Sequence, residues 1–297
     1  MIWASGWKLA SEVSNNGGLG LIGSGSMKPD LLREHIRKCG SATNKPFGVN
    51  LPLTRGDADE LVKIIIDEEV KIVFSSAGSP KKFINELKEK NTTVVHVVPS
   101  VKFALKAEMA GCDAIVGEGV EAGGHNGNDQ ITTMALIPQL VDVVKIPVIA
   151  AGGISDGRGI LAALSLGAEG VQMGTRFAAT VESSSHPNYK KRIVEATDDG
   201  TILAFKKIGL VRMLKNEFAE KASQAEAEGW DSDRLRELLG KKREMLGIFN
   251  GDENEGELEA GQSSGMIKEI LPVNVLMKKL VTELEEQINR MQIIIQH

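Results

Sequence analysis

The chain has 297 residues, of which 42% are hydrophobic and 25% charged, and its formal net charge is −5. These values are typical of a globular protein, and the length suits one large α/β barrel or a domain with an appendage. The acidic balance and the aromatic content of 4% exclude the basic stripe and stacking platforms typical of nucleic-acid binding.

Neither a membrane segment nor a disulfide framework is expected from the sequence. No run reaches the roughly 18 apolar residues of a membrane helix, and no basic segment precedes an apolar one at the start of the chain. The two cysteines, Cys39 and Cys112, lack the CxxC spacing of a zinc site. We therefore expect a cytoplasmic protein with two buried, unreactive thiols and no metal centre.

Seven short runs rich in valine and isoleucine alternate with amphipathic segments. The runs span residues 18–23, 46–51, 70–76, 93–98, 113–119, 147–153 and 170–175. Apolar runs without alternation are typical of strands buried on both faces, and intervening helices predict a parallel sheet. The fold class is therefore α/β. A TIM-type (β/α)8 barrel is favoured over an open doubly wound sheet, because no GxGxxG motif opens a helix after the first strand.

A closed barrel needs eight strands, and the sequence supplies seven such runs. The segment before residue 18 is predicted to be a loop followed by a helix, so the strand expected to be missing is the first. A sheet without that strand has two unpaired edges.

The pattern changes after residue 177. Residues 186–215 carry seven lysines and arginines against three acids, and helical segments follow near 215–228 and 231–246. An acidic, glycine-rich stretch then precedes an amphipathic helix from Val273 to Ile295. We predict a barrel over residues 1–199, a small helical lid over 200–265, and a C-terminal helix within 266–297 that returns to the barrel.

Two successive strand ends are suited to phosphate binding. One strand ends at Gly152-Gly153, with a helix expected from Asp156, and the next ends at Gly174-Thr175. Backbone N–H groups at a helix N-terminus bind phosphate, and glycine lets the phosphate come close. Barrels often place this site after strands seven and eight, which these two runs would be.

Further candidate residues follow other strands and so lie at the same mouth of the barrel. The Asn50 amide suits the edge of a planar heterocycle, or it satisfies its own turn. Ala77 and Gly78 leave room for a ligand ring against the backbone, and a Ser-Pro turn explains them equally well. His125, in VEAGGHNGN, is a candidate general acid or base, whereas His96 lies inside an apolar strand and is predicted to be a core residue.

Two segments outside the predicted barrel are candidates for its rim. Tyr189 lies beside three cations in SSSHPNYKKR, and we favour a solvated helix start there over a rim for an anionic substrate. The segment EAGQSSG, residues 259–265, is predicted to line the mouth of the barrel from the side of the lid.

Five segments taken together resemble one superfamily. They are SNNGGLGLIGSGS, KPFGVNL, GEGVEAGGHNG, IPVIAAGGISDGRGILAALSLGAEGVQMGTRF and ELEAGQSSG, and the resemblance runs from residue 1 to about 280. The chain resembles the FMN-dependent nitronate monooxygenases, formerly 2-nitropropane dioxygenases, and the related enoyl-acyl-carrier-protein reductases II. This resemblance implies an FMN-dependent oxidoreductase with a TIM-type barrel.

The resemblance also implies roles for the candidate residues. The FMN phosphate would be held by Gly152, Gly153, Gly174 and Thr175. The isoalloxazine and ribityl groups would lie along Asn50, Glu118, Gly123 and Gly124, and His125 would face the substrate. Members of the family normally begin with a strand that ends in a Gly-Gly-Met turn under the flavin, and here only Met1 of that turn would remain. We therefore expect the chain as given to be unstable or to bind FMN poorly.

Three functions are compatible with this resemblance. The leading one is the oxidation of alkyl nitronates with O₂, in which His125 binds the anion or deprotonates a neutral nitroalkane. The alternative is the NAD(P)H-dependent reduction of enoyl thioesters, with the basic excess at 190–215 as a docking surface for an acidic acyl carrier protein. The third is a flavin-binding protein impaired by the missing strand. We expect no nucleic-acid or membrane partner, and a homodimer is compatible with the sequence.

Overall fold

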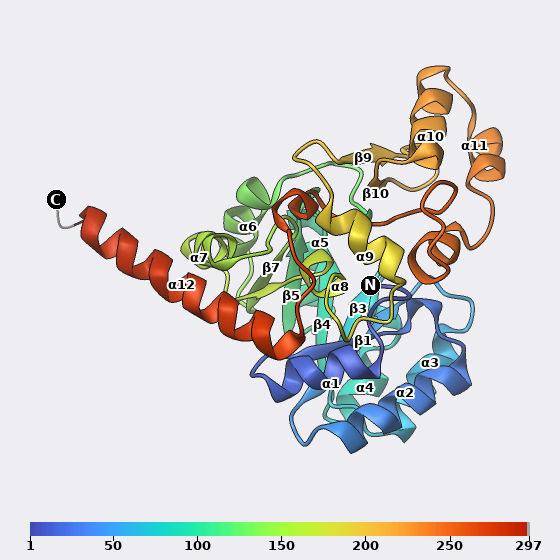
Figure 1. Ribbon diagram of the computed structural model, residues 1–297. Coiled ribbons are helices and arrows are strands. Elements are labelled where there is room, and N and C mark those ends of the chain that lie inside the picture. The colour runs from blue at the N-terminus through green and yellow to red at the C-terminus, as the bar shows by residue number, and fades with distance from the viewer. Residues whose placement is uncertain (296–297) are drawn as a thin grey trace.

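The computed structural model describes residues 1–295 and contains the predicted parallel sheet (Figure 1). Its seven strands, in sheet order, are β1 (Gly20–Gly23), β2 (Phe47–Pro52), β3 (Ile72–Ser76), β4 (Thr93–Val98), β5 (Ala114–Glu118), β7 (Val148–Ala151) and β8 (Gly170–Gln172). Every neighbouring pair is parallel. All seven strands predicted from the apolar runs are thus confirmed, and the sheet curls as in a TIM-type barrel.

Helices precede or connect the strands and cover the outer face of the curled sheet (Figure 1). They are α1 (Trp7–Asn15), α2 (Pro29–Ala42), α3 (Ala58–Asp67), α4 (Ile84–Glu89), α5 (Val101–Met109), α6 (Thr133–Val141) and α7 (Gly157–Ser165). This alternation of strand and helix is what a parallel sheet requires, because each crossover returns the chain to the same end of the sheet.

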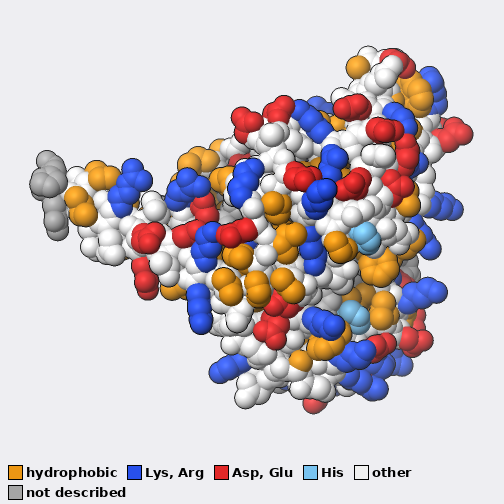
Figure 2. Space-filling model, in the orientation of Figure 1, with side chains coloured by type: hydrophobic (Ala, Val, Ile, Leu, Met, Phe, Trp, Pro, Cys, Tyr) orange, Lys and Arg blue, Asp and Glu red, His pale blue; other side chains and the backbone are white. Residues whose placement is uncertain are grey.

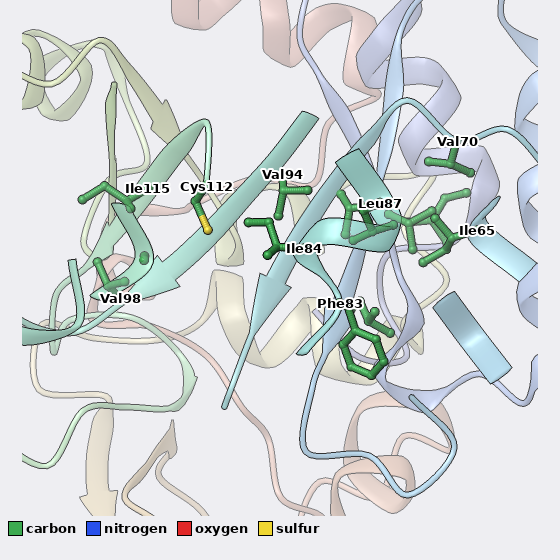
Figure 3. Close-up of a cluster of buried hydrophobic side chains, with 14 of the residues drawn as sticks. Ile65, Val70, Phe83, Ile84, Leu87, Val94, Val98, Cys112 and Ile115 are labelled. Atoms are coloured by element: carbon green, nitrogen blue, oxygen red, sulfur yellow. The ribbon is translucent and has the colours of Figure 1, made fainter. Parts of the chain in front are cut away.

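The strand side chains alternate between two apolar clusters, as the period of two in a strand dictates. Val94 and Ile115 belong to the large cluster that the strands share with Ile65 of α3 and Leu87 of α4 (Figure 3). A separate cluster, made by Phe74, Val95, Ala114, Val116 and Ala151, lies on the other face of the same strands. The two thiols are buried as predicted, and burial raises the pKa of Cys39 to about 12 and that of Cys112 to about 11.

The sheet is open between β1 and β8. Within residues 1–295, neither of these strands pairs with a further strand at its outer edge. Residues near the start of the chain connect the two sides instead. The Gly23 N–H donates to the Ser5 carbonyl at 2.9 Å, and the Ser184 N–H, after β8, donates to the Ala4 carbonyl at 3.1 Å.

The lid predicted over residues 200–265 contains two strands besides its helices. β9 (Thr201–Ala204) and β10 (Val211–Leu214) form an antiparallel sheet with β6 (Gly124–His125), in the order β6-β10-β9. The helices α10 (Glu217–Ala227) and α11 (Ser232–Leu239) pack on this sheet through a cluster that includes Phe205, Phe218 and Leu235. These strands were not predicted, because they do not form part of the repeated alternation of apolar run and amphipathic helix that marks the barrel strands.

Three more helices follow the barrel strands: α8 (Thr175–Ala178), α9 (Pro187–Val194) and α12 (Val273–Ile295), the last with the predicted bounds. α12 packs against α7 and then projects away from the barrel (Figure 1). Its projecting part carries hydrophobic and charged side chains together (Figure 2), with Met291 and Ile293 exposed. Among residues 1–295, no helix combines the length and apolar character needed to cross a membrane.

Candidate active site

A cavity lies at the carboxyl ends of β5, β7 and β8. The register places Glu118 beside Ala151 and Ala151 beside Gln172, and all three residues line the cavity. The carboxyl ends of the strands are where barrel enzymes build their active sites from the loops that follow. The cavity is therefore the candidate active site.

Most of the residues predicted to bind a cofactor meet at this cavity. Those that line it are Met1, Glu118, Gly123, Gly152, Gly153, Gly174 and Thr175. The segment 259–265, predicted to line the mouth from the lid, also contributes Glu259, Gly261 and Ser263. The other predicted cofactor residues do not line it, and they are Asn50, Ala77, Gly78 and Gly124.

The glycine turns after β7 and β8 fit a bound polar group. Gly152 and Gly153 have φ angles of 101° and 73°, in the left-handed region that favours glycine. A Cβ built on Gly174 would meet only the Met1 side chain, at 3.7 Å. Among the described residues, Ser155 Oγ and Gln172 Oε1 are buried without a hydrogen-bond partner. Open space and unpartnered polar atoms at two strand ends match what a flavin and its phosphate would need.

The N-terminus of α7 differs from the prediction, because the chain's own carboxylates occupy it. The Gly157 N–H donates to Glu283 Oε2 at 3.1 Å, and the Gly159 N–H donates to Asp156 Oδ1 at 3.0 Å. Acidic groups are stabilised there by the partial positive charge of the helix end. The loop glycines, rather than this helix end, are therefore the candidates for phosphate.

The loop after β5 is fixed by residues that were not predicted from the sequence. Glu121 accepts a hydrogen bond from the Thr133 N–H at 2.9 Å, at the start of α6. The Thr133 hydroxyl donates to the Gly152 carbonyl at 2.9 Å. Arg212 of β10 donates through Nε to the Val120 carbonyl at 2.9 Å. These bonds hold the loop between the barrel and the small sheet.

His125 stands on this loop, at the rim of the cavity rather than among its lining residues. It belongs to β6, where it is paired with Val211 of β10. Its side chain is 75% exposed, and Nδ1 lies 3.6 Å from Glu259 Oε1. The neighbouring Glu259 carboxyl group raises the pKa of His125 above its usual value, although partial desolvation acts in the opposite direction. The protonated form of this imidazole is thus favoured.

Two further carboxyl groups near His125 are shifted towards the neutral form. Burial raises the pKa of Glu118 to about 7, and the charge of Glu259 adds to the effect. Burial also raises the pKa of Glu257, which is 4% exposed and feels the same neighbour. Carboxyl groups with raised pKa values are typical of functional sites, and of these two Glu118 lines the cavity.

Several other residues singled out in the sequence have structural roles that account for their presence at these positions. The Asn50 amide donates to the Phe74 carbonyl at 3.1 Å on the neighbouring strand. Ala77 and Gly78 form a turn with φ angles of 50° and 111°. His96 is a core residue as predicted: its Nδ1 lies 2.8 Å from Ser75 Oγ, and burial lowers its pKa to about 4.

The predicted solvated helix start around Tyr189 is wrong. Tyr189 is 2% exposed and Lys190 is 8% exposed. The Lys190 ammonium donates to the Ser183 carbonyl at 2.8 Å, which satisfies the charged group inside the protein. Arg212, another cation of the basic segment, is 5% exposed. Charge runs are usually solvated, but here α9 packs under the lid segments, so its inward face is buried.

Comparison with known proteins gives consistent matches over nearly the whole chain. The family model for nitronate monooxygenase matches residues 1–63 and 54–283. A "probable nitronate monooxygenase" of Staphylococcus aureus is 33% identical, over 94% of this chain and 91% of that protein. A Mycobacterium tuberculosis protein is 34% identical over 95% of this chain and 90% of its own length, and it is named (3aS,4S,5R,7aS)-5-hydroxy-7a-methyl-1-oxo-octahydro-1H-indene-4-carboxyl-CoA dehydrogenase.

Two solved structures share both fold and sequence with the chain. FabK from Thermotoga maritima is 46% identical with a TM-score of 0.92, covering 98% of this chain and 93% of that one. The nitroalkane oxidase of Streptomyces ansochromogenes is 29% identical with a TM-score of 0.84, covering 98% of this chain and 95% of that one.

Proposed function

Because the chain belongs to the nitronate monooxygenase family of flavin-dependent oxidoreductases, we propose that it binds FMN and reduces an enoyl thioester with NAD(P)H. The observation that carries this proposal is the 46% identity to FabK of Thermotoga maritima, an enoyl-acyl-carrier-protein reductase II, over 98% of the chain. The order of the two leading functions is therefore the reverse of the one favoured from the sequence alone.

The cofactor would lie in the cavity at the ends of β5, β7 and β8. The turns at Gly152-Gly153 and Gly174-Thr175 would hold its phosphate, and Gln172 and Glu118 would lie beside its polar edges. Bound FMN would supply the redox chemistry, accepting a hydride from NAD(P)H and delivering it to the substrate. The barrel, residues 1–199, would bind the cofactor, and the lid, residues 200–265, would cover the substrate, while α12 packs on the barrel helix α7.

His125 is suited to donate the proton that this reduction consumes. Reducing an enoyl thioester adds a hydride to the β-carbon and a proton to the α-carbon, while NAD(P)H becomes NAD(P)⁺. The raised pKa of His125 increases the share of imidazolium over that of a free histidine, and the imidazolium can donate that proton. A protonated imidazole is a poor base for a neutral nitroalkane, so the same shift disfavours that role.

A thioester substrate also agrees with the Mycobacterium tuberculosis relative, whose name describes a coenzyme A ester. An acyl carrier protein is the proposed macromolecular partner. Lys190 and Arg212 are buried and cannot contribute to its docking surface. The exposed basic residues of the segment, such as Lys191 and Lys206, stay candidates for that role. A homodimer stays a prediction.

Nitronate oxidation is the second candidate, and the nitronate monooxygenase family model and the Staphylococcus aureus relative favour it. In that reaction a nitronate anion reduces the flavin and O₂ reoxidises it, without nicotinamide. His125 as an imidazolium would then bind the anion.

Anaerobic reduction of the FMN-loaded protein tests the proposal. We expect NADH or NADPH to bleach the flavin absorbance, and an enoyl-coenzyme A added next to restore it with formation of the saturated thioester. Bleaching by an alkyl nitronate but not by NADH or NADPH would overturn enoyl reduction in favour of nitronate oxidation. Full FMN occupancy without bleaching by either reductant would indicate a flavin-binding protein without turnover.

A further inference from the structure

The lid brings acidic side chains to His125 along one edge of β10. Gly124 of β6 pairs with Arg212, and the next residue of β10, Met213, forms an antiparallel bridge with Glu259. The Leu214 N–H also donates to the Leu258 carbonyl at 2.9 Å. The β6 strand and the segment around Glu259 therefore lie end to end on β10, although His125 and Glu259 are far apart in sequence.

The Glu259 carboxylate occupies the space beside Gly124. A Cβ added to Gly124 would lie 3.2 Å from Cδ and from Oε2 of Glu259. Gly124 also has a φ of 79°, which a side chain rarely adopts. The glycine before His125 thus makes room for this carboxylate, whose Oε1 lies 3.6 Å from His125 Nδ1.

The Glu259 carboxylate is well placed to orient the exposed His125 ring. The Glu259 side chain is 13% exposed, whereas the His125 side chain is 75% exposed. The Glu259 backbone is anchored by Tyr189, whose hydroxyl donates to its carbonyl at 2.5 Å. The Gly261 N–H, two residues on, donates to Thr175 Oγ1 at 2.9 Å. An exposed ring has few contacts of its own, so its orientation depends on this anchored neighbour.

The opposite edge of the imidazole faces Gly209. A Cβ built on Gly209 would lie 3.6 Å from His125 Cδ2 and 3.8 Å from Nε2. Because Gly209 has no side chain, nothing from that residue covers the Nε2 edge. With Nδ1 facing Glu259, Nε2 is the nitrogen available to a substrate.

We propose that Glu259 is a positioning residue, which holds the His125 ring as an imidazolium with Nε2 presented to the substrate. The assignment rests on the proposed function only for the identity of the proton acceptor, the α-carbon of an enoyl thioester. The coupling between Glu259 and His125 itself requires no substrate.

Other titratable groups also face this pair. The charges of Glu257 and Glu244, in the lid, raise the pKa of His125, and the charge of His125 lowers the pKa of Glu118 in β5. The charge of Arg243 lowers the pKa of Glu257, and the charge of the Met1 amino group lowers the pKa of Glu118. Burial shifts Glu257 and Glu118 towards their neutral forms, and Glu259 is the carboxyl group whose oxygen lies beside the imidazole, 3.6 Å from Nδ1.

The proposal is tested by an NMR titration of the His125 Cε1–H in the full chain, assigned with His125→Gln. Replacing Glu259 by glutamine keeps the shape and removes the charge. We expect Glu259→Gln to lower the titration midpoint of His125 by a few tenths to about one pH unit, as for a largely exposed ion pair. Glu259→Asp keeps the charge and should restore most of the midpoint. Glu220→Gln, an exposed carboxylate on α10, removes the same charge elsewhere and should leave the midpoint unchanged.

The activity assay then separates positioning from packing. The basic limb of the kcat profile for enoyl-thioester reduction should move to lower pH in Glu259→Gln by the same interval as the midpoint. An unchanged midpoint in Glu259→Gln would overturn the assignment, and so would a shifted midpoint with an unmoved kcat profile. Failure of the proposed function appears separately, as the absence of NAD(P)H-dependent turnover in the unmodified protein.

Discussion

The hydroxyl of Tyr189 donates a hydrogen bond to the backbone carbonyl of Glu259 at 2.5 Å, joining α9 to the lid segment beside His125. Tyr189 is 2% exposed, and burial raises its pKa above the usual value, so the hydroxyl stays protonated and can donate. The only tyrosine of the chain thus fixes the backbone of the residue that we propose to position His125.

Tyr189→Phe should destabilise the protein by about 1–3 kcal/mol, because the buried carbonyl of Glu259 loses its donor. The phenyl ring retains the packing, so the change isolates the hydrogen bond. Denaturant unfolding measures the effect, and the NMR midpoint of His125 should fall as well, because Glu259 is less firmly held. A variant that unfolds at the same denaturant concentration as the parent would contradict this role.

Gly174→Ala should weaken FMN binding while leaving the fold intact. Gly174 has a φ of −95°, which alanine adopts readily, and the new Cβ would meet only the Met1 side chain at 3.7 Å. Unfolding free energy should therefore change by less than about 0.5 kcal/mol. The same methyl group would occupy the space proposed for the phosphate, so FMN affinity should fall about tenfold or more, equivalent to about 1.4 kcal/mol.

Gly170→Ala is the matched control for this experiment, because Gly170 begins β8, the strand that precedes Gly174, and a Cβ there would meet nothing within 4 Å. Fluorescence titration of FMN into both variants gives the comparison. Equal affinities in the two variants would remove the turn at Gly174 from the cofactor site.

The seven barrel strands could be predicted because each lies within an apolar run, as is typical of a parallel sheet covered by helices. β9 and β10 could not, since they lie outside the repeated alternation of strand and helix and are stabilised by antiparallel pairing with a partner that the sequence does not reveal. The same limit applies to β6, a two-residue strand that places His125. Short elements of this kind depend on tertiary contacts rather than on local pattern.

The parts of the candidate site that consist of backbone turns could be predicted from the sequence. The contacts between its charged side chains could be predicted less well. Paired glycines at strand ends indicated the turns at Gly152 and Gly174, and the segment 259–265 was expected at the mouth. The contact between Glu259 and His125 could not be predicted, because it forms only when β6 and the segment around Glu259 both pair with β10. Acidic residues in a glycine-rich stretch are typical of a solvated loop, yet Glu257 is 4% exposed.

Arg212→Lys should destabilise the junction between the lid and the barrel by about 1.5–3 kcal/mol. Arg212 is 5% exposed and donates through Nε to the Val120 carbonyl at 2.9 Å and through Nη1 to Thr201 Oγ1 at 3.1 Å. A lysine keeps the charge but cannot present two donors in this fixed geometry. Arg236→Lys, at an exposed arginine on α11, should have almost no effect. Thermal unfolding of both variants measures the effect. An equal loss of melting temperature in the Arg212 and Arg236 variants would contradict this role of Arg212 at the junction.

Glu257→Gln should make the protein less sensitive to alkaline pH. Burial raises the pKa of Glu257 in the folded protein, so the folded state retains a proton that the unfolded state releases above about pH 4.3. The stability of the unmodified protein must therefore fall as the pH rises through the interval between the unfolded and the folded pKa. Glutamine cannot ionise and lacks this dependence. The melting temperature of Glu257→Gln relative to the parent should consequently increase from pH 5 to pH 8.

Glu255→Gln is the control on the same segment, because the pKa of Glu255 is shifted in the direction opposite to that of Glu257. The Lys221 ammonium lowers the pKa of Glu255, so this carboxylate is ionised in both the folded and the unfolded states throughout pH 5 to 8. Its replacement should change the melting temperature by an amount that does not vary over that range. If the Glu257 and Glu255 variants follow the same pH dependence in parallel scans, Glu257 is not the buried, protonated acid that its 4% exposure implies.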